Sequence, residues 1–131
     1  MIIDYATLTG AARVALGQDL PAMFANNDVT ATELQDISMA CEDPVWHMPL
    51  WAPYKRDLDS TIADMNNVGN AGGLGGAIHA ALFLKEFVKP DTDWIHIDTF
   101  GWRNSPSPGR PKGGEAYGMR AVFELIRQRY T

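Results

Sequence analysis

Apolar residues occur along the chain in two arrangements, as short continuous runs and as longer segments with helical spacing. The runs predict strands at Ile2–Ala6, Ala22–Ala25 and Trp94–Asp98, each followed by turn-forming or polar residues. Between them, apolar positions recur three or four residues apart, which is typical of helices. This alternation of strands and helices predicts an α/β fold.

The first two helices are predicted from the residues that begin and end them. Thr9 precedes residues 11–16 and is a suitable cap for a short helix there, which Gly17 ends. Thr30 and Glu33 form a capping-box pattern, which predicts the start of a second helix. Two helices are therefore expected in the first third of the chain.

Two further helices are expected in the second half. Residues 66–76 are dense in asparagine and glycine and predict a loop, which leads into a helix over residues 76–88. This helix is apolar almost all round, so it is expected to be buried. Residues 103–114 predict another loop, and residues 115–129 predict a last helix with one apolar face. That face comprises Met119, Val122, Phe123, Ile126 and Tyr130.

The predicted strands are few for a complete sheet. About three are expected, whereas sheets usually contain about four to six. Met1 is followed at once by a predicted strand, although chain termini usually lie loosely on the surface. We therefore expect residues 1–131 to form one α/β unit whose sheet lacks partners, encoded by part of a longer reading frame.

Composition and charge exclude several classes of protein. Apolar residues make up 46% of the chain, enough for a buried core, and the net charge is −5. This charge disfavours nucleic acid as a partner, and no apolar run is long enough to cross a membrane. The start lacks a secretory signal, and the single cysteine, Cys41, excludes an internal disulfide. A cytoplasmic location is expected.

A cluster of glycines precedes the third predicted helix and has two interpretations. It comprises Gly69, Gly72, Gly73, Gly75 and Gly76. A glycine-rich turn into a helix N-terminus can hold an anion. However, no strand closely precedes this turn, and no Gly-Lys-Ser/Thr follows it. The alternative is a tight turn whose backbone packs closely on a neighbour.

Two groups of residues offer metal ligands without completing a site. His96 and Asp98 share one face of a predicted strand, a spacing that can supply two ligands. Asp57, Asp59 and Asp64 form a loose acidic group that can bind a divalent cation. The alternatives are a buried, hydrogen-bonded histidine and a solvated or capping acidic face. From chemistry alone, the sequence contains no complete catalytic constellation.

Blocks with a characteristic order and spacing run through nearly the whole chain. The most specific read Asp-Tyr-Ala-Thr-Leu-Thr-Gly-Ala at residues 4–11, Ala-Asp-Met-Asn-Asn-Val-Gly at 63–69 and Trp-Ile-His-Ile-Asp at 94–98. Trp-His-Met-Pro-Leu at residues 46–50 and the apolar helix from residue 76 also match. The blocks resemble the leucyl aminopeptidase family, also called the cytosol aminopeptidase family. The resemblance identifies the chain as the C-terminal portion of a metallo-aminopeptidase catalytic domain.

The resemblance implies a fold, an activity and cofactors. That domain has a mixed β-sheet flanked by helices, so a partial mixed sheet is expected here. The family releases N-terminal amino acids from peptides with two divalent metal ions, Zn²⁺ or Mn²⁺, and its members are typically homohexamers. Its acidic signature, Asn-Thr-Asp-Ala-Glu-Gly-Arg, precedes the matching blocks and is absent here. We therefore expect no metal ligand and no catalytic residue in this chain; the missing N-terminal part of the enzyme would supply them.

Substrate contacts are what the resemblance assigns to this chain. Thr7, Leu8 and Gly10 match the loop that lies against the bound peptide, where backbone groups can hold an extended substrate. Phe100 and Trp102 match the loop that lines the pocket for the N-terminal side chain. Family members often carry small residues near Phe100, so its bulk implies a narrowed or reshaped pocket.

Three functions remain open at this point. The first is a segment of a metallo-aminopeptidase that is inactive alone. The second is a non-catalytic remnant of that fold that binds a peptide or a partner. The third is an anion- or nucleotide-binding α/β domain that uses the glycine cluster.

Overall fold

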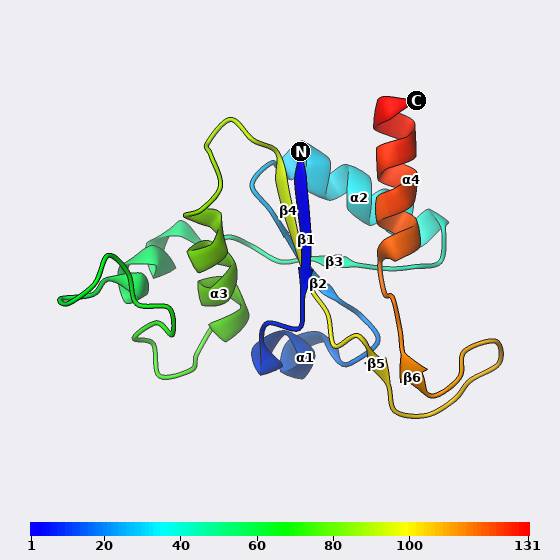
Figure 1. Ribbon diagram of the computed structural model, residues 1–131, viewed down its shortest axis with the longest axis horizontal. Coiled ribbons are helices and arrows are strands. Elements are labelled where there is room, and N and C mark those ends of the chain that lie inside the picture. The colour runs from blue at the N-terminus through cyan, green and yellow to red at the C-terminus, as the bar shows by residue number, and fades with distance from the viewer.

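All three predicted strands form in the computed structural model, which describes residues 1–131, and a fourth joins them (Figure 1). They are β1 (Ile2–Ala6), β2 (Ala22–Ala25), β3 (Trp46–His47) and β4 (Trp94–Asp98). The sheet has the order β1-β4-β2-β3, with β1 parallel and β2 antiparallel to β4. The expected α/β fold with a mixed sheet is confirmed, and β1 lies at one edge.

The strand β3 escapes prediction because its two residues carry no periodic pattern. They belong to a segment rich in proline and aromatic residues. Pairing with β2 creates the strand: Trp46 N donates to Pro21 O at 3.0 Å, and Met48 N donates to Met23 O at 2.8 Å. Tertiary pairing, rather than local propensity, therefore decides this element.

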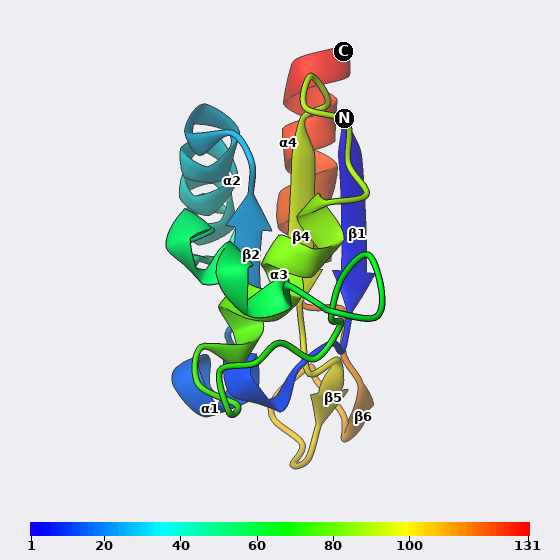
Figure 2. The same cartoon turned by 90° about the vertical axis from the view of Figure 1, so that its left-hand side faces the viewer.

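Helices cover both faces of the sheet (Figure 2). They are α1 (Gly10–Leu16), α2 (Asp28–Ala40), the 3₁₀ helix η1 (Ala52–Leu58), α3 (Gly76–Lys85) and α4 (Met119–Tyr130). Met23 and Ile97 belong to a core cluster with buried residues of α2 and α4, whereas Ala22 and Phe24 pack with α1 and α3. Because both faces are covered, every residue of β4 is buried. None of the helices has the length and apolarity needed to cross a membrane.

The predicted start of α2 is wrong by three residues, because Asn27 and not Thr30 caps this helix. Asn27 Oδ1 accepts hydrogen bonds from Val29 N at 3.0 Å and Thr30 N at 3.4 Å. Thr30 is buried inside the helix, and its hydroxyl donates to Asp93 Oδ2 at 3.0 Å. A tertiary partner thus takes the hydroxyl that the capping-box pattern assigns to the helix start.

The helix α4 begins four residues later than predicted because its start is held by a distant carboxylate. Gly118 adopts the left-handed region at φ 75°. Asp43 then accepts hydrogen bonds from Gly118 N at 2.9 Å and from Arg120 N at 2.8 Å. A buried carboxylate at this position also suits the positive end of the helix dipole.

The predicted apolar face of α4 is only partly buried. Val122 is buried as expected, together with Ala121 and Leu125. The other predicted members are exposed: Met119, Phe123, Ile126 and Tyr130. The sheet in this chain is too narrow to cover them, so an apolar surface remains open beside β1.

The remaining elements are short. The helix α3 ends at Lys85, three residues before its predicted end, and its buried residues include Ala77, Ala81 and Leu82. The predicted loop at residues 103–114 contains a small hairpin of β5 (Trp102–Arg103) and β6 (Gly113–Gly114). This hairpin lies beyond the carboxyl end of β4 (Figure 1).

Candidate functional site

The carboxyl ends of β1 and β4 bring the two predicted substrate loops together. Because these strands are parallel neighbours, residues 7–10 and 99–101 leave the sheet at the same edge (Figure 1). Thr99 N donates to Ala6 O at 2.9 Å, which continues the pairing into the loops. In α/β sheets, ligands usually bind at this edge.

Asp98 holds the first loop. Its carboxylate accepts hydrogen bonds from Leu8 N at 3.0 Å, Thr9 N at 3.3 Å and the Thr9 hydroxyl at 2.6 Å. The same hydroxyl accepts from Ala12 N at 3.1 Å and caps α1, as predicted. The sequence suggested Asp98 only as a metal ligand, and its position at a strand end gave no sign of this organising role.

The three residues that the resemblance places against a bound peptide lie at the surface, and we call them the peptide wall. Thr7, Leu8 and Gly10 are all exposed. A Cβ on Gly10 would meet no other heavy atom within 4 Å, so open space lies beside this backbone. The N–H groups of Leu8 and Thr9 already donate to Asp98, so a bound peptide would meet other groups of the loop.

The second loop lies directly beside the first. A Cβ on Gly101, at φ +65°, would lie 3.8 Å from Thr7 Oγ1. Phe100 is half-buried, and the Arg13 guanidinium stands over its ring, 4.5 Å from the centroid. Trp102 is exposed in β5. The four expected substrate-binding residues, Thr7, Leu8, Gly10 and Phe100, thus belong to neighbouring loops.

A hollow of about 230 Å³ opens at the same edge. It is lined by Tyr5, Thr99, Glu115, Ala116, Tyr117 and Met119. Tyr117 donates from its hydroxyl to Asp19 Oδ1 at 2.7 Å. Burial, and then the hydrogen bond to Asp19, raise the pKa of Tyr117 to about 12, so its hydroxyl keeps the proton that it donates to Asp19.

His96 is a buried, hydrogen-bonded histidine, which is the alternative to a metal ligand that the sequence left open. Its Nδ1 donates to Asp4 Oδ1 at 2.5 Å, and Trp94 Nε1 donates to Asp4 Oδ2 at 2.7 Å. Burial disfavours the Asp4 carboxylate, but these two hydrogen bonds outweigh it and lower the pKa of Asp4. His96 and Asp98 therefore serve separate partners, although His96 Nε2 has none.

Packing around α3 explains part of the glycine cluster and one member of the acidic group, Asp57. A Cβ on Gly75 would lie 3.2 Å from the Tyr54 ring, so this position requires glycine. The Asp57 carboxylate accepts from His79 Nε2 at 2.9 Å, which joins η1 to α3. Nowhere do three His, Cys, Asp or Glu side chains gather as a metal ion requires. The residues present thus do not fit a two-metal centre.

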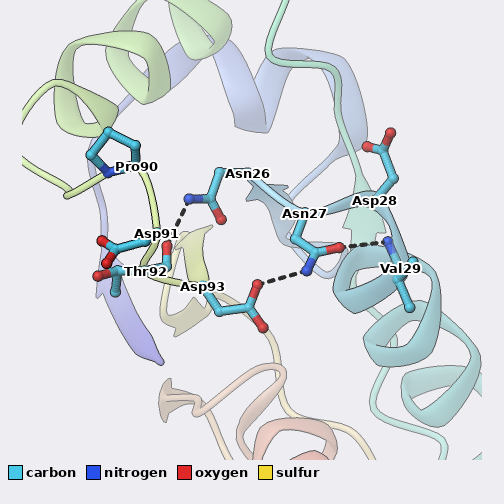
Figure 3. A pocket seen from close by; sticks show the side chains of 8 residues that line it. All are labelled: Asn26, Asn27, Asp28, Val29, Pro90, Asp91, Thr92 and Asp93. Atoms are coloured by element: carbon cyan, nitrogen blue, oxygen red, sulfur yellow. Dashed lines mark hydrogen bonds between the residues drawn. The ribbon is translucent and has the colours of Figure 1, made fainter.

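A larger hollow, of about 490 Å³, lies at the other end of the sheet (Figure 3). Its side chains bind one another: Asn26 Nδ2 donates to Thr92 O, and Asn27 Nδ2 donates to Asp93 Oδ1, both at 2.8 Å. Size alone therefore does not identify the site. The edge at the carboxyl ends of β1 and β4 combines exposed backbone with Arg13, which has no acidic partner. We therefore favour this edge as the functional site.

Comparison with known proteins supports the resemblance to the cytosol aminopeptidase family over nearly the whole chain. Residues 1–123 match the model of the cytosol aminopeptidase family, catalytic domain. A probable cytosol aminopeptidase of Prochlorococcus marinus is 43% identical over 123 residues, which are 92% of this chain and 24% of that protein.

Solved structures agree. The cytosol aminopeptidase of Coxiella burnetii is 50% identical with a TM-score of 0.93, over 99% of this chain and 28% of that one. A mutant of tomato leucine aminopeptidase is 38% identical with a TM-score of 0.83, over 98% of this chain and 24% of that one. The chain thus spans about a quarter of the length of its relatives. By sequence and by fold, it belongs to the catalytic domain of the cytosol aminopeptidase family.

Proposed function

We propose that residues 1–131 are the C-terminal portion of the catalytic domain of a leucyl-type metallo-aminopeptidase, which releases N-terminal amino acids from peptides. The observation that carries this proposal is the loop at residues 7–10, held open at the carboxyl edge by Asp98. This loop lies in the family match and combines exposed backbone with a rigid support.

The role of this segment is substrate positioning and core packing. Thr7, Leu8 and Gly10 form one wall, and Phe100 borders the pocket for the N-terminal side chain. Asp98 fixes the wall from below, because three of its hydrogen bonds converge on two residues. A rigid wall holds the peptide for attack without further loss of conformational freedom.

The rest of the active centre belongs to the missing N-terminal part of the same enzyme. It would hold two divalent ions, Zn²⁺ or Mn²⁺, and the catalytic residues, since the donor groups present here do not gather. We also propose a cytoplasmic homo-oligomer, a hexamer as in the family. Under this proposal the isolated chain has no aminopeptidase activity.

A second candidate is a non-catalytic remnant that binds a peptide or a partner. The exposed apolar residues beside β1 favour partner binding, because a bound partner would cover them. The nucleotide-binding alternative has no such support, since Gly69, Gly75 and Gly76 are explained by contacts with His79, Tyr54 and Ala11.

A chimera tests the proposal. Residues 1–131 replace the matching segment of the Coxiella burnetii enzyme, and hydrolysis of leucine anilide is measured with Mn²⁺ or Zn²⁺. The chimera is expected to hydrolyse the anilide, and the isolated chain is expected to match a metal-only blank. A folded but inactive chimera would favour the remnant, and turnover by the isolated chain would refute the proposal.

A further inference from the structure

One arginine of this chain lacks the acidic partner that all the others have. The sequence contains seven arginines. Six have a carboxylate oxygen within 4.0 Å: Arg56, Arg103, Arg110, Arg120, Arg127 and Arg129. Arg13 has none, and the one interaction of its side chain is with the Phe100 ring.

The carboxylates near this edge are already occupied. Glu115 accepts from Arg103 Nε at 3.0 Å, Asp19 accepts from the Tyr117 hydroxyl at 2.7 Å, and Asp98 holds the loop. The positive charge of Arg13 is therefore not neutralised from within the chain, although the chain as a whole carries a net charge of −5.

Arg13 is also held at the peptide wall. It lies three residues after Gly10 on α1, so both point to the same side of the helix. Stacking on Phe100 uses the flat face of the guanidinium. The N–H donors lie in the plane of the group and remain available at its rim, where a carboxylate can accept two of them.

We propose that Arg13 is a specificity-determining residue that binds a carboxylate of the substrate. This inference rests on the proposed function, and it adds the substrate class. The carboxylate comes from an acidic N-terminal side chain or from the C-terminus of a dipeptide. Phe100 would then hold the Arg13 guanidinium at the substrate pocket, in addition to narrowing that pocket.

Substrate pairs in the chimera described above separate the two sources. Glutamate anilide is compared with glutamine anilide, and leucyl-glycine with leucyl-glycinamide. In Arg13→Gln, the kcat/KM ratio of one carboxylate substrate to its neutral partner is expected to fall roughly tenfold, as for the loss of a hydrogen bond to a charged group. The pair that responds identifies the source. Arg56→Gln, a surface arginine outside the site, is the matched control and should leave both ratios unchanged.

Two results would overturn the inference. If the chimera is active, the inference fails when Arg13→Gln leaves both kcat/KM ratios unchanged. A folded but inactive chimera counts against the proposed function instead, and the inference is then decided on the 131-residue chain by NMR. The Arg13 Nε–H signal should shift with glutamate anilide or leucyl-glycine but not with the neutral partner, glutamine anilide or leucyl-glycinamide, and no shift with either carboxylate compound would sink the inference.

Discussion

At the scale of single residues, buried carboxylates position the loops of this chain. Asp98 and Asp43 are both buried, and each accepts hydrogen bonds from two backbone N–H groups of a segment far away in sequence. Removing such a group leaves buried donors without partners, which costs more than the net value of one hydrogen bond. These two aspartates are therefore the residues at which small changes should have large effects.

Replacing Asp98 should loosen the loop at residues 7–10. Asp98→Ala removes the acceptor for two backbone N–H groups and the Thr9 hydroxyl, so we expect a loss of about 3 kcal/mol in the free energy of unfolding. Urea denaturation measures it. The control is Asp91→Ala at an exposed aspartate. A loss below about 1 kcal/mol would contradict the role of Asp98.

Gly118 tests the start of α4. Its φ is +75°, and a Cβ there would lie 2.8 Å from Val45 Cγ1. Gly118→Ala therefore combines backbone strain with a clash, and we expect a loss of about 3 kcal/mol in the free energy of unfolding. Gly109, at φ +73°, has nothing within 4 Å, so Gly109→Ala should show the backbone cost of about 1 kcal/mol alone. Equal losses in thermal or urea unfolding would show that the Val45 contact is unimportant.

At the scale of elements, an ionic network joins α2, α4 and the start of β4. Arg129 donates to Glu33, to Asp93 Oδ2 at 3.0 Å and to the Thr30 hydroxyl at 2.8 Å. Burial disfavours the Asp93 carboxylate, but hydrogen bonds from Asn27, Thr30 and Arg129 outweigh it and lower its pKa. One side chain thus links three elements that are separate in sequence.

The lowered pKa of Asp93 predicts a pH dependence. A carboxyl group whose pKa is lower in the folded than in the unfolded state stabilises the fold above its unfolded pKa, which is near 3.8. This stabilisation is lost as the pH falls through the folded pKa. Asp93→Asn should therefore be less stable than the parent by about 1 kcal/mol at pH 7, and the difference should shrink below about pH 4. Urea midpoints across this range measure it, and a constant difference would contradict the assignment.

At the scale of the whole molecule, this chain has an open side. The outer edge of β1 has no neighbouring strand, and Ile2 and Tyr5 on that strand are exposed. A hollow of about 420 Å³ beside it is lined by Met1, Ile3, Ile126 and Tyr130. Unpaired edges and apolar patches of this kind favour association with other chains. A chain that spans a quarter of its relatives would be expected to expose surfaces that the remainder covers.

The open side predicts that the isolated chain self-associates through β1. Ile2→Lys should shift the population toward monomer in light-scattering measurements, because a charge on an edge strand opposes edge pairing. Ile62→Lys is the matched control, since this isoleucine is exposed in a loop far from the edge. A monodisperse monomer of the parent chain, or an equal effect of both substitutions, would contradict the prediction.

The sequence by itself determined the elements whose signals are local. The strands β1, β2 and β4 follow from continuous apolar runs, and α1 follows from its cap at Thr9 and the glycine after it. The blocks that run in order through nearly the whole chain, from residues 4–11 to residues 94–98, also identified the family. These features need only neighbouring residues, so they can be recognised without the fold.

Only the tertiary structure decided which polar group serves which partner. Asn27 caps α2 because Asp93 takes the Thr30 hydroxyl, and α4 begins late because Asp43 holds Gly118 from 75 positions away. Asp98 supports the loop at residues 7–10, and Arg13 is left without an acidic partner, for the same reason. A carboxylate binds the donors that the fold brings nearest, and sequence spacing does not encode that distance.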